Sequence, residues 1–162
     1  GKGDEKMKLL VFSDSHRALG TMYDAVEREQ PDAVLHLGDH LGDAEDLETA
    51  FPEVEFYCVP GNCDYFTGGP QSLTLELDGV RMFLTHGHLF GVKSGPERLA
   101  LEARRVGAQI ALFGHTHRAL LEQREDGLWL MNPGACGAGR SEYGEIITDG
   151  RGGFACRLCR AE

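Results

Sequence analysis

Side chains that bind metal ions recur at the ends of apolar segments in this chain. Asp14 and His16 follow the apolar run 8–13, and Asp39 follows the run 32–37. Three later runs are followed in the same way by Asn62, His86, His115 and His117. Neutral imidazole and carboxylate groups suit zinc, manganese and iron. The pattern therefore predicts a metal site assembled from several loops.

The candidate ligands are too numerous for a single tetrahedral ion, which takes four. Two Asp, one Asn and four His side chains suit a pair of ions about 3.5–4 Å apart that share one carboxylate. Asp39 comes from the loop between the other groups and is the natural bridge. Two divalent ions keep a net positive charge after Asp14, Asp39 and a bridging hydroxide are counted. Such a site favours a phosphate anion and lowers the pKa of the bridging water.

The segments that carry these residues predict a layered α/β domain with two packed sheets. Ligands of α/β sheets lie at the carboxyl ends of strands, so the loops converge if the strands are neighbours. The first half alternates predicted strands at 8–13, 32–37 and 54–59 with helices at 19–29 and 44–50. The second half predicts strands at 72–77, 80–85, 109–113, 119–124, 128–131, 145–148 and 154–158, with one helix at 96–106.

Local signals mark some of the expected boundaries. Asp78-Gly79 is a hairpin turn signal between two strands. Ser94 is the expected N-cap of the helix at 96–106, and Gly107 is its expected C-terminal stop. Cys156-x-x-Cys159 lacks the second pair of a zinc ribbon, and we interpret it as part of a terminal strand.

Length and composition limit the class of protein. The 162 residues fit one domain, and we expect residues 1–6 to be an N-terminal extension or tag remnant and residues 7–162 to form that domain. The net charge of −10 gives no general electrostatic attraction to nucleic acid or anionic membranes. No apolar window is long enough to span a membrane. Five cysteines, an odd number, favour a cytoplasmic setting without a disulfide framework.

Five short motifs follow one another along the chain: Asp14-Ser15-His16, Gly38-Asp39, Gly61-Asn62-Cys63-Asp64, His86-Gly87-His88 and Gly114-His115-Thr116-His117. In this order they resemble the calcineurin-like metallophosphoesterases, in particular their small prokaryotic phosphodiesterase branch. The resemblance covers residues 8 to about 158 and implies a four-layer α/β/β/α sandwich, with two mixed β-sheets flanked by helices. It implies that Asp14, His16, Asp39 and His117 hold one metal ion, and Asp39, Asn62, His86 and His115 a second.

The resemblance also implies an activity. We expect a hydrolase, a dinuclear metal-dependent phosphodiesterase that acts through a metal-bridging hydroxide. Asn62, His86 and His115 are assigned to catalysis, with Asn62 beside a phosphoryl oxygen. Two divalent ions are expected, Mn²⁺ first, with Zn²⁺, Fe²⁺ or Ni²⁺ also compatible. Cys63 replaces a His that many members use to protonate the leaving group, and we expect Cys63 to line the site without being the essential acid.

Two other functions stay open. One is a phosphomonoesterase or nucleotide phosphatase, which would need more cations than Arg17, Lys93 and Arg140. The other is a catalytically inactive scaffold of the same fold. A homo-oligomer is also expected, with contacts at Tyr65-Phe66 and the loop 135–139.

The remaining polar residues near the motifs receive structural interpretations. His36 is expected in the core and His40 in an exposed loop. Two interpretations stay open for His88, contact with the substrate or a metal and no role in the site. Asp64 is expected to cap a turn. The acidic residues Asp43, Glu45, Asp46 and Glu48 are expected on a solvated helix face.

Overall fold

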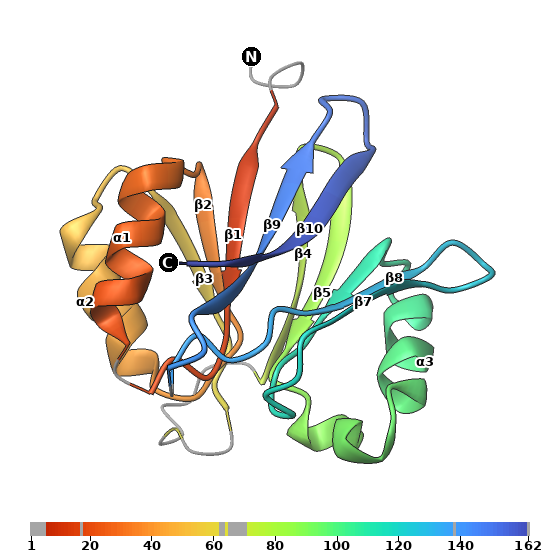
Figure 1. Ribbon diagram of the computed structural model, residues 1–162. Coiled ribbons are helices and arrows are strands. Elements are labelled where there is room, and N and C mark those ends of the chain that lie inside the picture. The colour runs from red at the N-terminus through yellow and green to blue at the C-terminus, as the bar shows by residue number, and fades with distance from the viewer. Residues whose placement is uncertain (1–5, 17, 62–63, 65–70, 138, 162) are drawn as a thin grey trace.

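Two mixed five-stranded sheets pack face to face, with helices on both outer faces (Figure 1). The structure is a computed structural model that describes residues 6–16, 18–61, 64, 71–137 and 139–161. The first sheet has the order β10-β9-β1-β2-β3 and the second β4-β5-β6-β8-β7. Helices α1 (Leu19–Glu29) and α2 (Leu41–Ala50) cover the first sheet, and α3 (Glu97–Arg105) covers the second. The predicted four-layer sandwich is confirmed.

In the first sheet, β1 (Lys8–Phe12), β2 (Ala33–His36) and β3 (Glu55–Cys58) are parallel. The antiparallel hairpin of β9 (Glu142–Thr148) and β10 (Phe154–Arg160) joins this sheet at β1. Since the three parallel strands run side by side, the loops that follow them meet at one edge, where ligands bind in α/β sheets.

The second sheet also has three parallel strands, but they lie in its middle. It contains β5 (Val80–Thr85), β6 (Ile110–Leu112) and β8 (Trp129–Asn132), all parallel. Each edge strand, β4 (Ser72–Leu77) and β7 (Leu120–Gln123), is antiparallel to its neighbour. Two short 3₁₀ turns, η1 (His88–Phe90) and η2 (Val92–Ser94), link β5 to α3.

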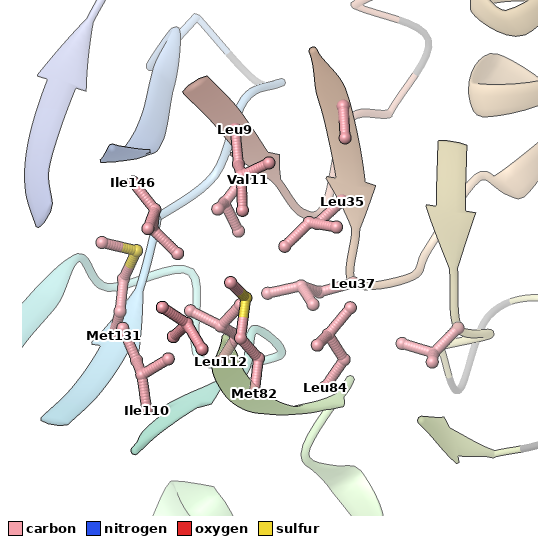
Figure 2. Close-up of a cluster of buried hydrophobic side chains, with 13 residues drawn as sticks. Leu9, Val11, Leu35, Leu37, Met82, Leu84, Ile110, Leu112, Met131 and Ile146 are labelled. Carbon is pink, nitrogen blue, oxygen red and sulfur yellow. The ribbon is translucent and has the colours of Figure 1, made fainter. Parts of the chain in front are cut away.

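Alternate residues of the central strands fill two different layers of core. Leu9 and Val11 of β1 lie between the sheets, while Leu10 and Phe12 face the helices. Strands buried on both faces are apolar throughout, which is why the sequence shows runs and not alternation. Figure 2 shows the cluster between the sheets.

Element boundaries differ from the predictions where the backbone leaves regular conformations. α2 begins at Leu41 and not at residue 44, directly after His40, whose φ is 69°. Ser94 does not cap α3, because η2 ends there and Pro96 takes the N-cap position without a side-chain hydrogen bond. Gly107 does stop α3: its φ is 75°, and Ala108 N donates to Ala103 O over 2.9 Å, as in a Schellman motif.

The terminal cysteine pair is confirmed as part of a strand. Cys156 packs against the core between the sheets and Cys159 against the core beneath the helices, so their side chains lie on opposite faces of β10. Burial raises the pKa of Cys156 to about 11, which suppresses the reactive thiolate.

Ala135, Cys136 and Gly137 are buried within the chain, so the loop expected at a subunit contact does not offer them as a surface. Tyr65 and Phe66 lie outside the described residues. No helix in the described part of the chain combines the length and apolarity needed to cross a membrane.

Candidate metal centre

Four predicted ligands from both sheets converge on one point. The ligand atoms of Asp14, His16, Asp39 and His117 all lie within 4.8 Å of one another. Asp14 and His16 follow β1, Asp39 follows β2 and His117 follows β6. The two carboxylates are buried and the two imidazoles are partly exposed, as at the floor and mouth of an open site.

A second pair of histidines lies against the same carboxylates. His86 Nε2 lies 3.6 Å from Asp39 Oδ2 and 3.9 Å from Asp14 Oδ1. The His86 and His115 rings pack edge to face with their centroids 5.1 Å apart. The structure therefore brings six of the seven predicted ligands together. Asn62, the seventh, and Cys63 lie outside the described residues.

One oxygen of Asp14 is anchored and the other faces the centre. Asp14 Oδ2 accepts hydrogen bonds from Ser13 Oγ over 2.7 Å and from His115 N over 3.2 Å. Asp14 Oδ1 is buried without a hydrogen-bond partner, although His117 Nε2 lies 3.2 Å away. A buried carboxylate oxygen without a donor carries a large desolvation cost unless a cation neutralises it.

The tautomer of His86 follows from its single hydrogen bond. His86 Nδ1 lies 2.7 Å from Leu37 O, and a carbonyl only accepts, so Nδ1 carries the proton. Nε2 then presents a lone pair to Asp14 and Asp39 and has no hydrogen-bond partner. Three acceptors facing one another repel unless a positive ion lies among them. This donor set, which also includes the buried Nε2 of His16, fits a divalent metal.

The ligand loops share an uncommon backbone conformation. Non-glycine residues rarely adopt positive φ, and such residues concentrate at functional sites. Five of the predicted ligands have φ between 43° and 72°, namely Asp14, His16, Asp39, His115 and His117.

Glycine allows the two sheets to approach each other at this edge. A Cβ on Gly114 would overlap Ser13 Oγ and lie 3.0 Å from Asp14 Oδ2. Any larger residue at position 114 would therefore push the loop of His115 away from Asp14. The high glycine content, 22 residues, is thus partly explained by the loops of the site.

A buried polar network supports the loops from below. His36 is fully buried and accepts a hydrogen bond from Gly38 N at Nδ1 over 3.1 Å. Its Nε2 lies 3.2 Å from Ser15 Oγ, which donates to Asp43 Oδ2 over 2.7 Å. The core role of His36 is confirmed, and burial lowers its pKa to about 4. The solvated position predicted for Asp43 is wrong, because its carboxylate is buried against Ser15.

Asp64 fixes the loop that contains Asp39. Its carboxylate accepts hydrogen bonds from Asp39 N over 2.8 Å, Leu41 N over 3.0 Å and Gly61 N over 2.8 Å. The predicted role as a turn cap is confirmed. Because the cap spans two loops, it also holds the backbone of a predicted ligand in place.

Two further histidines flank the centre. The centroids of the His40 and His16 rings are 4.7 Å apart, so His40 packs against a predicted ligand and is not a simple loop residue. The centroid of the His88 ring lies 5.6 Å from that of His86 and 6.1 Å from that of His115. Burial is the main cause that lowers the pKa of both His88 and His115, which favours the neutral imidazole that binds metals.

Asn132 holds the loop of His115 and His117, a role that the sequence did not reveal. Its Nδ2 donates to Gly114 O over 3.2 Å and to Thr116 Oγ1 over 3.0 Å, while its Oδ1 accepts from Gly134 N over 2.9 Å. The Asn-Pro-Gly turn was the available signal, since an Asn at a turn often bonds the backbone two residues on.

Arg140 donates to the backbone carbonyl of His117 over 2.5 Å and so lies beside the centre, as the sequence suggested. Lys93 lines the same surface groove as Thr116, which lies between His115 and His117 in the chain, so it too is near. Arg17 lies outside the described residues.

The chain is similar to known phosphoesterases over most of its length. The model of the calcineurin-like phosphoesterase superfamily domain matches residues 7–148. "Probable metallophosphoesterase YsnB" of Bacillus subtilis is 35% identical over 130 residues, which are 80% of this chain and 75% of that protein. "Phosphodiesterase YfcE" of Escherichia coli is 35% identical over 105 residues, 56% of this chain and 52% of that protein.

Solved structures share the same architecture. A conserved uncharacterized protein of Streptococcus pneumoniae superposes with a TM-score of 0.79 at 26% identity, covering 96% of this chain and 90% of that one. Vacuolar Protein Sorting 29 of Cryptosporidium parvum has a TM-score of 0.76 at 16% identity, over 97% and 99% of the two chains, and shows the fold alone. From the family match, with the sandwich and the convergent Asp and His side chains, we conclude that this chain belongs to the calcineurin-like phosphoesterase superfamily.

Proposed function

We propose that this protein is a phosphodiesterase that works with two divalent metal ions, and that Mn²⁺ is the preferred ion. The observation that carries the proposal is the convergence of four predicted ligands on one point, where three buried acceptor atoms, Asp14 Oδ1, His16 Nε2 and His86 Nε2, have no hydrogen-bond partner. Asp14, His16, Asp39 and His117 would hold one ion, and Asp39, Asn62, His86 and His115 the other. When bound, two such ions lower the pKa of a shared water and compensate the charge of phosphoryl oxygens.

The protein's own residues prepare this chemistry by fixed orientation. The Leu37 carbonyl holds the His86 ring with Nε2 turned toward Asp14 and Asp39. The lowered pKa of His115 favours its neutral form, which can bind an ion. We also propose Asn62, His86 and His115 as the catalytic residues, with Asn62 beside a phosphoryl oxygen.

The test compares metal-depleted and Mn²⁺-loaded protein on an aryl phosphodiester. We expect Mn²⁺ to restore hydrolysis, and Asp39→Asn to lower kcat/KM by about 100-fold or more, since even residues that only support ligands cost 10–100-fold. Asp46→Asn is the matched control, because Asp46 lies on the exposed side of α2. Equal rates with and without metal would exclude the proposal.

A phosphomonoesterase is the second candidate, and one observation favours it. Arg118 lies in the same surface groove as Lys93, beside Thr116 of the ligand loop, and adds a cation that the sequence did not suggest. Monoesters carry more negative charge than diesters and gain more from such cations. The ratio of kcat/KM for matched aryl mono- and diesters decides between the two.

A further inference from the structure

A groove of about 610 Å³ opens beside the metal centre, between the link from β5 to α3 and the segment that follows β6. Thr116, which lies between His115 and His117 in the chain, forms part of its wall. Pro96, Ala119 and Leu120 are at least partly exposed and give the groove an apolar surface, and Lys93 and Arg118 give it a charged one. A molecule bound at the metal centre could therefore extend into this groove.

The two cations in the groove lack acidic partners. Lys93 and Arg118 are exposed and form no ion pair with any described residue. Most other described cations are paired, for example Arg104 with Asp126 over 2.6 Å and Arg157 with Glu145 over 2.7 Å. In a chain of net charge −10, two unpaired cations in one groove form a local positive site.

We propose that this groove binds the leaving group of the substrate, and that this group carries an anionic substituent that contacts Lys93 and Arg118. The inference rests on the proposed phosphoesterase function and adds a substrate class to it. The apolar body of the leaving group packs on Pro96 and Leu120, which are partly exposed in the groove. The anion is a carboxylate or a phosphate, the two groups that Lys and Arg bind in common.

The experiment uses two methyl aryl phosphodiesters that release a nitrophenol, one with a carboxylate on the ring and one with a carboxamide of similar size. We expect Mn²⁺-loaded protein to prefer the carboxylate by about tenfold in kcat/KM, because exposed ion pairs contribute up to about fivefold each. A third substrate with a phosphate on the leaving group shows which anion is preferred.

The double variant Lys93→Ala, Arg118→Ala should reduce the ratio of carboxylate to carboxamide to about one. Arg151→Ala is the control, because Arg151 is exposed, unpaired among the described residues and lies in the β9–β10 turn, outside the groove. The control should keep both the wild-type activity and the ratio. Equal kcat/KM for the two substrates in wild-type protein would overturn the proposal and leave the phosphodiesterase function intact.

Binding provides a readout that does not depend on turnover. Calorimetry compares the methyl aryl phosphonates with the same two rings on Mn²⁺-loaded wild type and double variant. Tighter binding of the carboxylate by wild type alone supports the groove even in a protein without diesterase activity. Equal affinities in wild type overturn it.

Discussion

At the level of single residues, Ser15, His36 and Asp43 join the loop after β1 to the loop after β2 and to α2. The backbone N–H of Gly38 donates a hydrogen bond to Nδ1 of His36, so Nδ1 is the acceptor of the neutral ring. The ring proton is therefore on Nε2 and points to Ser15 Oγ. The Ser15 hydroxyl is then free to donate to Asp43. Each polar group has one role, and the network fixes Ser15 between two predicted ligands.

Asp43 is not a predicted metal ligand, but its replacement should still weaken metal binding. Asp43→Ala leaves the buried Ser15 hydroxyl without its 2.7 Å acceptor, which costs about 1–3 kcal/mol in the free energy of unfolding. We expect the metal affinity to fall by about 10–100-fold, measured by calorimetry. Asp46→Ala, on the exposed side of the same helix, should change stability by no more than about 0.5 kcal/mol. Equal metal affinities in the two variants would refute the role of Asp43.

His36 should make stability depend on pH. Its folded pKa of about 4 lies below the ordinary 6.5, so the unfolded chain binds the proton more readily. The contribution of His36 is therefore complete above pH 6.5 and is lost as the pH falls toward 4. Between pH 7 and pH 5 this amounts to about 2 kcal/mol. Urea unfolding with a chelator should show this loss in wild type and a smaller one in His36→Gln; the same loss in both would contradict it.

The convergence of six candidate ligands could be predicted from the sequence, because each of them follows an apolar strand and has metal-binding chemistry. The role of Asp43 could not, since a run of acidic residues ordinarily marks a solvated helix face. Its partner Ser15 is far away in the sequence, and only the packing of α2 against the β1 loop brings the two together.

At the level of elements, the site depends on how closely the loops after β1 and β6 approach. Gly114→Ala would place a methyl group against Ser13 Oγ and Asp14 Oδ2 and separate the loops. We expect metal affinity to fall by about 10–100-fold, as for other changes that shift a ligand without removing it. Metal titration followed by calorimetry measures this.

Gly20→Ala is the matched control. Gly20 lies in α1 with open space where a Cβ would point, so alanine should stabilise the helix by about 0.5–1 kcal/mol and leave metal binding unchanged. A normal metal affinity in Gly114→Ala would show that the loops do not need this close approach.

The strands were predictable because apolar runs and hairpin signals are local. Asp78 and Gly79 both have positive φ, as the predicted turn requires. The start of α2 was not predictable, because it depends on the left-handed conformation of His40. The start of α3 was predicted to within one residue, but its N-cap was not, because η2 ends at Ser94.

At the level of the whole molecule, the centre connects two sheets that otherwise meet through apolar packing. Because Asp14 and Asp39 come from one sheet and His86, His115 and His117 from the other, a bound ion should stabilise their association. Saturation at 100 times Kd adds about 2.7 kcal/mol to the free energy of unfolding.

Thermal unfolding should show this as an increase in Tm of about 5–10 °C with Mn²⁺ relative to chelator. Asp39→Asn should lose most of the increase. An identical Tm with metal and with chelator would mean that the described ligands do not form a binding site.

The number of layers was predictable from the family resemblance, but the partners of each strand were not. Nothing in the apolar pattern of β9 indicates that it joins β1, since both are simply buried strands. Long-range pairing depends on how all strands compete for neighbours.

The pairing of β1 with β9 has a consequence for biosynthesis. Leu9 of β1 pairs with Ile146 of β9, so the central strand β1 gains one of its two neighbours only after β9 has been translated. At about 5–20 residues per second, translation as far as Ile146 takes about 7–30 s. Every predicted ligand leaves the ribosome before that neighbour does. Until the β9–β10 hairpin emerges, one edge of β1 is open to strands of other nascent chains, and slow translation should therefore promote aggregation.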